Sequence, residues 1–156
     1  MVRGVLSSDH LVEAPASAVW SAYSGLELPR LITELLSDVL GVAEVVQGDG
    51  GVGTVIRVTS VPGSAGPGDF IDVYTKVDDE ARVKEKETVE GGFRALGFSL
   101  YRMRFEVMEK GESAAVIRST VEYEVEDEEK AKLVSMKPLE LIAEAVGKFV
   151  VEKRNM

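Results

Sequence analysis

The chain has 156 residues, of which 45% are hydrophobic, and a formal net charge of -9 at pH 7. This length suits one domain with a buried core, while the acidic balance argues against nucleic-acid binding and against anchoring on anionic lipid, both of which need basic patches. There is no cysteine, which excludes disulfides and thiolate chemistry.

The N-terminal part of the sequence predicts one long strand and two short helices. Residues Val2–Glu13 read as the strand. Ser17 is a candidate N-cap for a short helix that ends at Tyr23. A second short helix begins at Glu27, with Pro29 in its tolerated first turn.

A dense glycine cluster, Gly48–Thr54, lies between two strand-like runs, Val39–Gln47 and Val55–Ser60. Such glycines can crowd backbone N–H groups into an anion-binding concavity, as phosphate loops do. A phosphate loop also needs a lysine and a following helix, whereas no lysine stands in this cluster and residues 54–58 alternate like a strand. The cluster is therefore predicted to be a turn between two strands.

The middle of the chain predicts strands joined by short turns. The strand-like segments are Val52–Val61, Asp69–Val77, Ala81–Val89, Leu96–Glu109 and Ala114–Val125. The apolar alternation changes phase within Leu96–Val107, which predicts a β-bulge near Leu100 or Tyr101. Consecutive strands with short turns indicate an antiparallel sheet.

The C-terminal part, from Glu126 to about Glu152, predicts a long helix with acidic residues near its start. Pro138 is expected to kink this helix or split it in two. Its apolar positions recur at helical spacing and form one face: Leu139, Ile142, Ala143, Val146, Phe149 and Val150. The overall class is α+β, and a curved sheet around such a helix can leave a small-molecule cavity.

Several short motifs accompany this order of elements along essentially the whole chain. They are Val19-Trp20-Ser21-Ala22-Tyr23-Ser24, Leu28-Pro29, Gly48–Thr54, Val77-Asp78-Asp79-Glu80, Arg82-Val83-Lys84, Glu90-Gly91-Gly92-Phe93, Leu96-Gly97 and Glu122-Tyr123-Glu124-Val125. Together they resemble the plant birch-pollen-allergen family, also called class 10 pathogenesis-related proteins, and most closely its norcoclaurine synthase-like branch. The resemblance implies a helix-grip fold, in which a seven-stranded antiparallel sheet grips a long C-terminal helix over a large hydrophobic cavity.

Norcoclaurine synthases join an arylethylamine to an aldehyde in a Pictet–Spengler reaction, and their pattern uses a lysine, a glutamate, a tyrosine and an aspartate. In this chain the lysine position matches Lys84, while the glutamate position falls on Asp72. The tyrosine position falls on Phe70 and the aspartate position on Met103, neither of which can transfer a proton at neutral pH. Only one of the four residues is kept in type.

Strand parity leaves two orientations open for Lys84, which shares its face with Arg82, Lys86 and Thr88. It is either a solvated lysine or a desolvated one, with a lowered pKa and a capacity for base chemistry. Asp72 shares a face with Phe70 and Tyr74, opposite Ile71, Val73 and Val77. If that face points inward, Asp72 can act as a base, anchor an amine, or pair with Lys84.

Our leading interpretation is binding of a small hydrophobic or aromatic plant metabolite, such as a phytohormone, alkaloid or phenolic. The alternative is a norcoclaurine synthase-like lyase or isomerase, with Lys84 as base and Asp72 assisting. A third hypothesis, a ribonuclease, is opposed by the acidic charge. The expected ligand-binding residues are Phe70, Tyr74, Phe93, Tyr101, Met103, Ile142 and Val146.

The remaining expectations concern cofactors, partners and compartment. His10 is the only histidine and is interpreted as structural, so neither a metal site nor a cofactor is expected. The start of the sequence lacks the pattern of a signal peptide, and no apolar run is long enough to span a membrane. We expect one domain over residues 1–156 in a cytoplasmic protein, monomeric or weakly dimeric, without nucleic-acid or membrane partners.

Overall fold

The computed structural model describes residues 1–64 and 66–156. The elements in chain order are β1 (Val2–Val12), α1 (Ala16–Tyr23), α2 (Glu27–Leu36), β2 (Val42–Gln47), β3 (Val55–Thr59), β4 (Phe70–Asp78), β5 (Val83–Gly91), α3 (Gly92–Ala95), β6 (Leu100–Glu109), β7 (Ala115–Val125), α4 (Glu128–Ala131) and α5 (Lys137–Arg154). The predicted α+β class and the order of its elements are confirmed.

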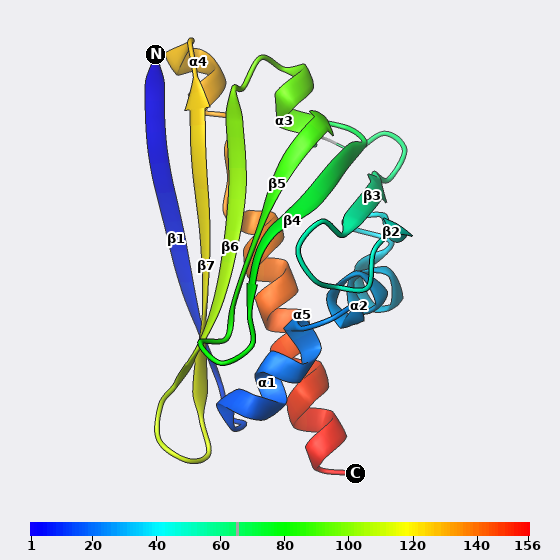
Figure 1. Ribbon diagram of the computed structural model, residues 1–156, viewed down its shortest axis with the longest axis vertical. Helices are drawn as coiled ribbons and strands as arrows, with labels where there is room; N and C mark the ends of the chain where they lie inside the picture. Colours follow the sequence, from blue (N-terminus) through cyan, green and yellow to red (C-terminus); the bar gives the residue numbers. More distant parts are fainter. Residues whose placement is uncertain (65) are drawn as a thin grey trace.

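The strands form one antiparallel sheet of seven strands in the order β1-β7-β6-β5-β4-β3-β2. The sheet curves around α5, and α1 and α2 pack beside that helix (Figure 1). This is the helix-grip architecture expected from the resemblance. None of the helices in the described part of the chain combines the length and apolar character needed to cross a membrane.

The bulge predicted near Leu100 or Tyr101 is wrong. Strand β6 pairs with β7 without interruption from Leu100 opposite Glu124 to Glu109 opposite Ala115. The phase change arises because residues 96–99 belong to the turn after α3 rather than to the strand. Phe98 is buried from this turn, so an apolar side chain continues the core without following the strand alternation.

Register shifts occur instead between β4 and β5, near Asp72 and again between Tyr74 and Lys76. The second shift places Val77 opposite Lys84. Val77 therefore packs against the buried residues Ile56 and Tyr74, and its predicted position on the face opposite Asp72 is wrong. An extra residue in one strand reverses the alternation beyond it.

Pro138 splits the predicted C-terminal helix. The short helix α4 precedes α5, and Pro138 occupies the first turn of α5. Proline has no N–H to donate, and the first turn of a helix needs none there. The buried face of α5 consists of Leu139, Ile142, Ala143, Val146, Gly147 and Val150.

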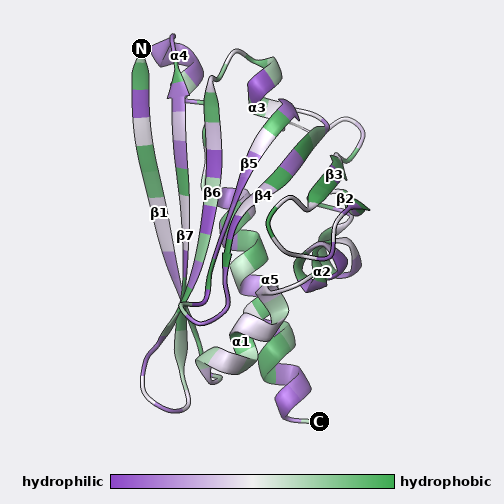
Figure 2. Ribbon diagram, in the orientation of Figure 1, coloured by the Kyte–Doolittle hydropathy of each residue, from purple (hydrophilic) through white to green (hydrophobic). Residues whose placement is uncertain are grey.

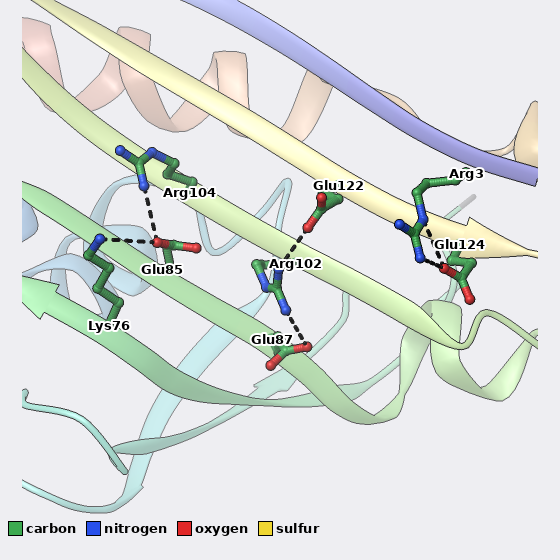
Figure 3. A network of polar contacts seen from close by, with 8 residues as sticks. All are labelled: Arg3, Lys76, Glu85, Glu87, Arg102, Arg104, Glu122 and Glu124. Carbon is green, nitrogen blue, oxygen red and sulfur yellow. Dashed lines mark hydrogen bonds and ion pairs between the residues drawn. The ribbon is translucent and has the colours of Figure 1, made fainter.

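The outer face of the sheet carries a network of ion pairs that crosses five strands (Figure 3). Glu85 lies 3.1 Å from Arg104, and Arg102 lies 2.7 Å from Glu122. The residues of this network are Arg3, Lys76, Glu85, Glu87, Arg102, Arg104, Glu122 and Glu124. Polar residues alternate with apolar ones along these strands (Figure 2). Because side chains alternate along a strand, the outward position of the glutamates of β5 turns its lysines inward.

Candidate functional site

Buried polar side chains cluster on the inner face of β4 and β5. Asp72 and Lys84 are both 0% exposed, and Lys86 and Thr88 are buried beside them. Polar groups of this kind are expensive to bury without partners. The interpretation of Lys84 as a solvated lysine is therefore wrong, and both predicted catalytic residues lie inside the protein.

The ammonium group of Lys84 is held at the C-terminal end of α1. Its Nζ donates a hydrogen bond to the backbone oxygen of Tyr23 and a second, of 3.3 Å, to that of Gly25. The last carbonyls of a helix lack partners within the helix and attract positive charge. The ring of Tyr74 lies 4.4 Å from Nζ and adds a cation–π contact.

Burial changes the acid–base properties of Lys84. Its pKa falls from 10.5 to about 7, chiefly because burial disfavours the charged form and secondly because Lys86 is a like charge. Asp79 acts in the opposite direction. At neutral pH the amine therefore exists in both protonation states, which is the condition under which a side chain exchanges protons efficiently.

Asp72 is paired with Lys86 rather than with Lys84, which was one of the roles that the sequence left open for it. Its Oδ2 lies 3.1 Å from Lys86 Nζ, and its Oδ1 accepts a 2.7 Å hydrogen bond from the hydroxyl of Thr88. The strand register explains this choice. Asp72 faces Thr88 and Tyr74 faces Lys86, so Lys86 is the diagonal neighbour of Asp72, whereas Lys84 lies farther along, opposite Val77.

Lys86 is the functional residue that sequence reasoning missed. Strand alternation placed Lys86 on the same face as Lys84, but the pattern of the norcoclaurine synthases contains only one lysine. Its ammonium also lies 5.7 Å from the ring centroid of Phe105. Two lysines and a carboxylate thus share one buried face, and together they set the electrostatics of the interior.

Aromatic side chains form a wall beside this polar cluster. Phe93 stacks on Tyr101 with ring centroids 4.4 Å apart, and Phe98 meets Phe93 edge-on at 5.1 Å. Burial, together with the negative charge of Asp72, raises the pKa of Tyr74 and of Tyr101. Both phenols therefore stay protonated over the working pH range and can donate hydrogen bonds.

The other expected ligand-binding residues lie on two sides of the interior. Met103 is buried on β6, opposite Lys86, while Ile142 and Val146 are buried on α5 in the same core. Phe70 is half-buried and packs against the smaller cluster around Tyr74. Six of the seven residues thus lie on strands β4 and β6 or on α5, and Phe93 packs against the same core from α3.

The described part of the chain has two hollows, and no residue of the buried polar cluster lines either of them. One is bordered by Pro15, Arg82 and Glu109, the other by Arg30, Phe149 and Lys153. The large internal cavity implied by the resemblance is neither of these and stays a prediction. Within residues 1–64 and 66–156, no group of three or more acidic or histidine side chains is arranged to hold a metal ion.

A contact between α1 and the turn after β4 steadies the site. Trp20 Nε1 donates a 3.1 Å hydrogen bond to Asp79 Oδ1. Trp20 and Tyr23 belong to the same short helix, so this bond ties the carbonyls that bind Lys84 to the hairpin that carries Lys84. The position of the amine is therefore fixed from both sides.

Comparison with known proteins places these features in context. No family model matches the chain. It is 42% identical over 156 residues to norbelladine synthase from Narcissus pseudonarcissus, covering 99% of this chain and 96% of that protein. The structure of norcoclaurine synthase from Thalictrum flavum in complex with dopamine and hydroxybenzaldehyde matches with a TM-score of 0.86 and 34% identity, covering 97% of this chain and 88% of that one. The structure of Ara h 8.0201 shares the fold, with a TM-score of 0.77 over 97% of this chain and 99% of that one, at 16% identity.

Proposed function

The chain belongs to the plant birch-pollen-allergen family, in its norcoclaurine synthase-like branch, and we propose that it condenses an arylethylamine with an aromatic aldehyde. The similarities favour this enzymatic interpretation over the carrier interpretation that the sequence ranked first. Binding of a small aromatic molecule is common to both. The observation that carries the proposal is the buried amine of Lys84, with its pKa of about 7.

Lys84 is the base and acid of the proposed reaction. Neutral Lys84 first accepts a proton from the substrate ammonium, and the freed amine attacks the aldehyde carbon. As the C–N bond forms, a second proton passes from the nitrogen to the aldehyde oxygen and gives a neutral carbinolamine. The Lys84 ammonium then protonates the hydroxyl of the carbinolamine, the C–O bond breaks, and water leaves an iminium ion. Lys84 is neutral again after this step, so it can also accept the ring proton if a C–C bond closes the ring.

Asp72 stabilises the cationic iminium in this scheme. Lys86 and Thr88 hold its carboxylate on the inner face. Its Oδ2 lies within ion-pair distance of Lys86 but makes no hydrogen bond of good geometry to the described residues, so it retains the capacity to accept one. A fixed carboxylate near a developing positive charge stabilises the transition state, and it does so more strongly where bulk water is excluded.

Met103 limits the proposed chemistry. It stands where the family pattern has an aspartate, and a thioether offers an aromatic substrate a packing surface but no proton transfer. The C–N bond-forming half needs only Lys84 and Asp72. Ring closure has lost one of its proton-handling groups, so we expect it to be the slower half.

The direct test is to incubate the protein with dopamine and a panel of aromatic aldehydes, including hydroxybenzaldehydes, and to separate the products on a chiral column. The wild type is compared with Lys84→Met and with Lys148→Met, which removes an exposed lysine of α5. The proposal predicts a stereoselective product that Lys84→Met loses and Lys148→Met keeps. An uncatalysed yield from all three proteins, together with saturable micromolar displacement of a fluorescent apolar probe, overturns the enzyme and leaves the carrier.

A further inference from the structure

The glycine cluster Gly48–Thr54 forms the turn between β2 and β3, as the sequence predicted. The N–H groups of Gly50, Gly51, Gly53 and Thr54 are used within the turn or on the neighbouring strand. The N–H of Gly50 donates to Thr54 Oγ1 at 2.9 Å, and that hydroxyl donates in turn to the backbone oxygen of Gly51 at 2.7 Å. These four donors are therefore engaged in the fold and not directed at an anion.

One side of this turn is fixed to the strand that carries Asp72. The N–H of Gly53 donates to the backbone oxygen of Tyr74, and the N–H of Tyr74 donates to the backbone oxygen of Thr54, both at 2.9 Å. Tyr74 is the residue whose ring lies over the ammonium of Lys84. The backbone of the turn thus sets the position of one contact of Lys84.

The other side of the turn lies against Gly25, which follows the C-terminal end of α1. A Cβ atom added to Gly50 would lie 2.5 Å from the carbonyl carbon of Gly25 and 2.8 Å from its oxygen. That oxygen accepts the 3.3 Å hydrogen bond from Lys84 Nζ. Gly50 lies directly against the Gly25 peptide group. A displacement of Gly50 therefore moves the Gly25 carbonyl, which is the hydrogen-bond acceptor of Lys84.

We propose that the glycine turn is a positioning element for Lys84, acting through Gly50 on the Gly25 carbonyl and through Gly53 and Thr54 on Tyr74. Only a glycine allows this contact, because any larger residue at position 50 forces the Gly25 peptide away. The catalytic consequence rests on the proposed function, but the effect on Lys84 does not. Losing a hydrogen-bond acceptor destabilises the ammonium form and lowers the pKa of Lys84 further.

A matched pair of variants separates this role from ordinary turn strain. Gly50 has φ of 104° and Gly53 has φ of 92°, so alanine is strained at both positions. A Cβ at Gly53 meets no atom within 4 Å. Gly50→Ala therefore adds the clash with Gly25, whereas Gly53→Ala adds only the backbone strain.

The pKa of Lys84 is measured by NMR titration of protein labelled with ¹³C at lysine Cε, with the signal assigned by its absence in Lys84→Met. Loss of a hydrogen bond to a charged group predicts that Gly50→Ala lowers the Lys84 pKa by at least about one unit. Gly53→Ala keeps the backbone N–H that bonds to Tyr74 and adds no contact, so it is expected to shift the Lys84 pKa by less than Gly50→Ala does. Because Gly50→Ala can fail to fold, Thr54→Val is measured as well; it removes the hydroxyl that closes the turn and is expected to shift the pKa in the same direction, while Thr54→Ser retains the wild-type value.

A Lys84 pKa that is unchanged in Gly50→Ala and Thr54→Val overturns the proposal, as does an equal shift in Gly50→Ala and Gly53→Ala. These outcomes do not depend on catalysis. If the wild type shows no condensation while Gly50→Ala still shifts the Lys84 pKa, the positioning role stands and the proposed enzyme fails.

Discussion

The Asp72 carboxylate lies 3.1 Å from the ammonium of Lys86, and both side chains are buried on the inner face of the sheet. Asp72 is thereby paired with Lys86, and Lys84 has no carboxylate among its hydrogen-bond partners in the described chain. A lysine paired with an acid is held charged, whereas one bound only to carbonyls gives up its proton more readily. Burial is the chief cause of the lowered pKa of Lys84, and no paired carboxylate offsets it.

Lys86→Met is expected to lower the free energy of unfolding by about 3–5 kcal/mol, because it leaves Asp72 buried without its charge partner. The double variant Lys86→Met/Asp72→Asn removes both charges and is expected to recover most of this loss. Urea denaturation of the wild type, Lys86→Met, Asp72→Asn and the double variant measures the coupling. Purely additive effects would mean that Asp72 and Lys86 do not form an energetically significant pair.

Lys84 is expected to make the stability of the protein depend on pH. Its pKa is about 7 in the folded chain and near 10.5 when exposed, so between these values the unfolded chain binds more protons. The free energy of unfolding of the wild type relative to Lys84→Met therefore rises with pH across this window, by at most about 1.4 kcal/mol per pH unit. Below pH 7 the difference is constant.

Urea titrations at pH 6 to 10 test this dependence, with Lys148→Met as the exposed control. Wild type and Lys148→Met should follow the same curve, and Lys84→Met should diverge from both as the pH rises. Three parallel curves would show that the pKa of Lys84 is not depressed in the folded protein.

Met103→Asp is expected to favour ring closure. Met103 is buried and faces Lys86 across the β5–β6 pair, so a carboxylate at this position gains a cationic neighbour. We expect at least about a tenfold increase in the ring-closed fraction of the product. Met103→Asn matches the aspartate in size and cannot transfer a proton, so it should leave that fraction unchanged. An equal gain in both variants would assign the effect to pocket shape.

The ring of Tyr74 is expected to support the charged form of Lys84. Tyr74→Phe keeps an aromatic face over Nζ and should leave the pKa of Lys84 within a few tenths of the wild-type value. Tyr74→Leu removes the cation–π contact, worth roughly 1–2 kcal/mol at a desolvated site, and should lower that pKa. NMR titration of Lys84 distinguishes the two. A shift in Tyr74→Phe as large as in Tyr74→Leu would attribute the effect to the hydroxyl.

Much of the fold follows from local patterns in the sequence. The turn chemistry around Gly48–Thr54 and the apolar face of residues 139–150 depend on neighbouring residues only, and the structure agrees with both. Pro138 was correctly expected to interrupt the C-terminal helix. The error near Leu100 has a physical cause, since a buried aromatic such as Phe98 gives the same signal from a turn as from a strand.

The site was predictable in part. The sequence left a solvated and a buried Lys84 both open, and the structure shows the buried one. The partner of Asp72 was not predictable, because it depends on the register between β4 and β5, and two shifts alter that register. The carbonyls of Tyr23 and Gly25 were also beyond sequence reasoning, because backbone acceptors leave no trace in residue types and lie about sixty residues from Lys84.

The role of Lys84 is decided by the pH dependence of kcat/KM for condensation of dopamine with hydroxybenzaldehyde, after subtraction of the uncatalysed rate at each pH. We expect a limb with an apparent pKa near 7 in the wild type, moved to lower pH in Gly50→Ala and absent in Lys84→Met, whose residual rate falls by about 10²–10⁴. A wild-type profile without such a limb, or one that Lys84→Met leaves unchanged, would contradict the assignment of Lys84 as the proton-transfer group.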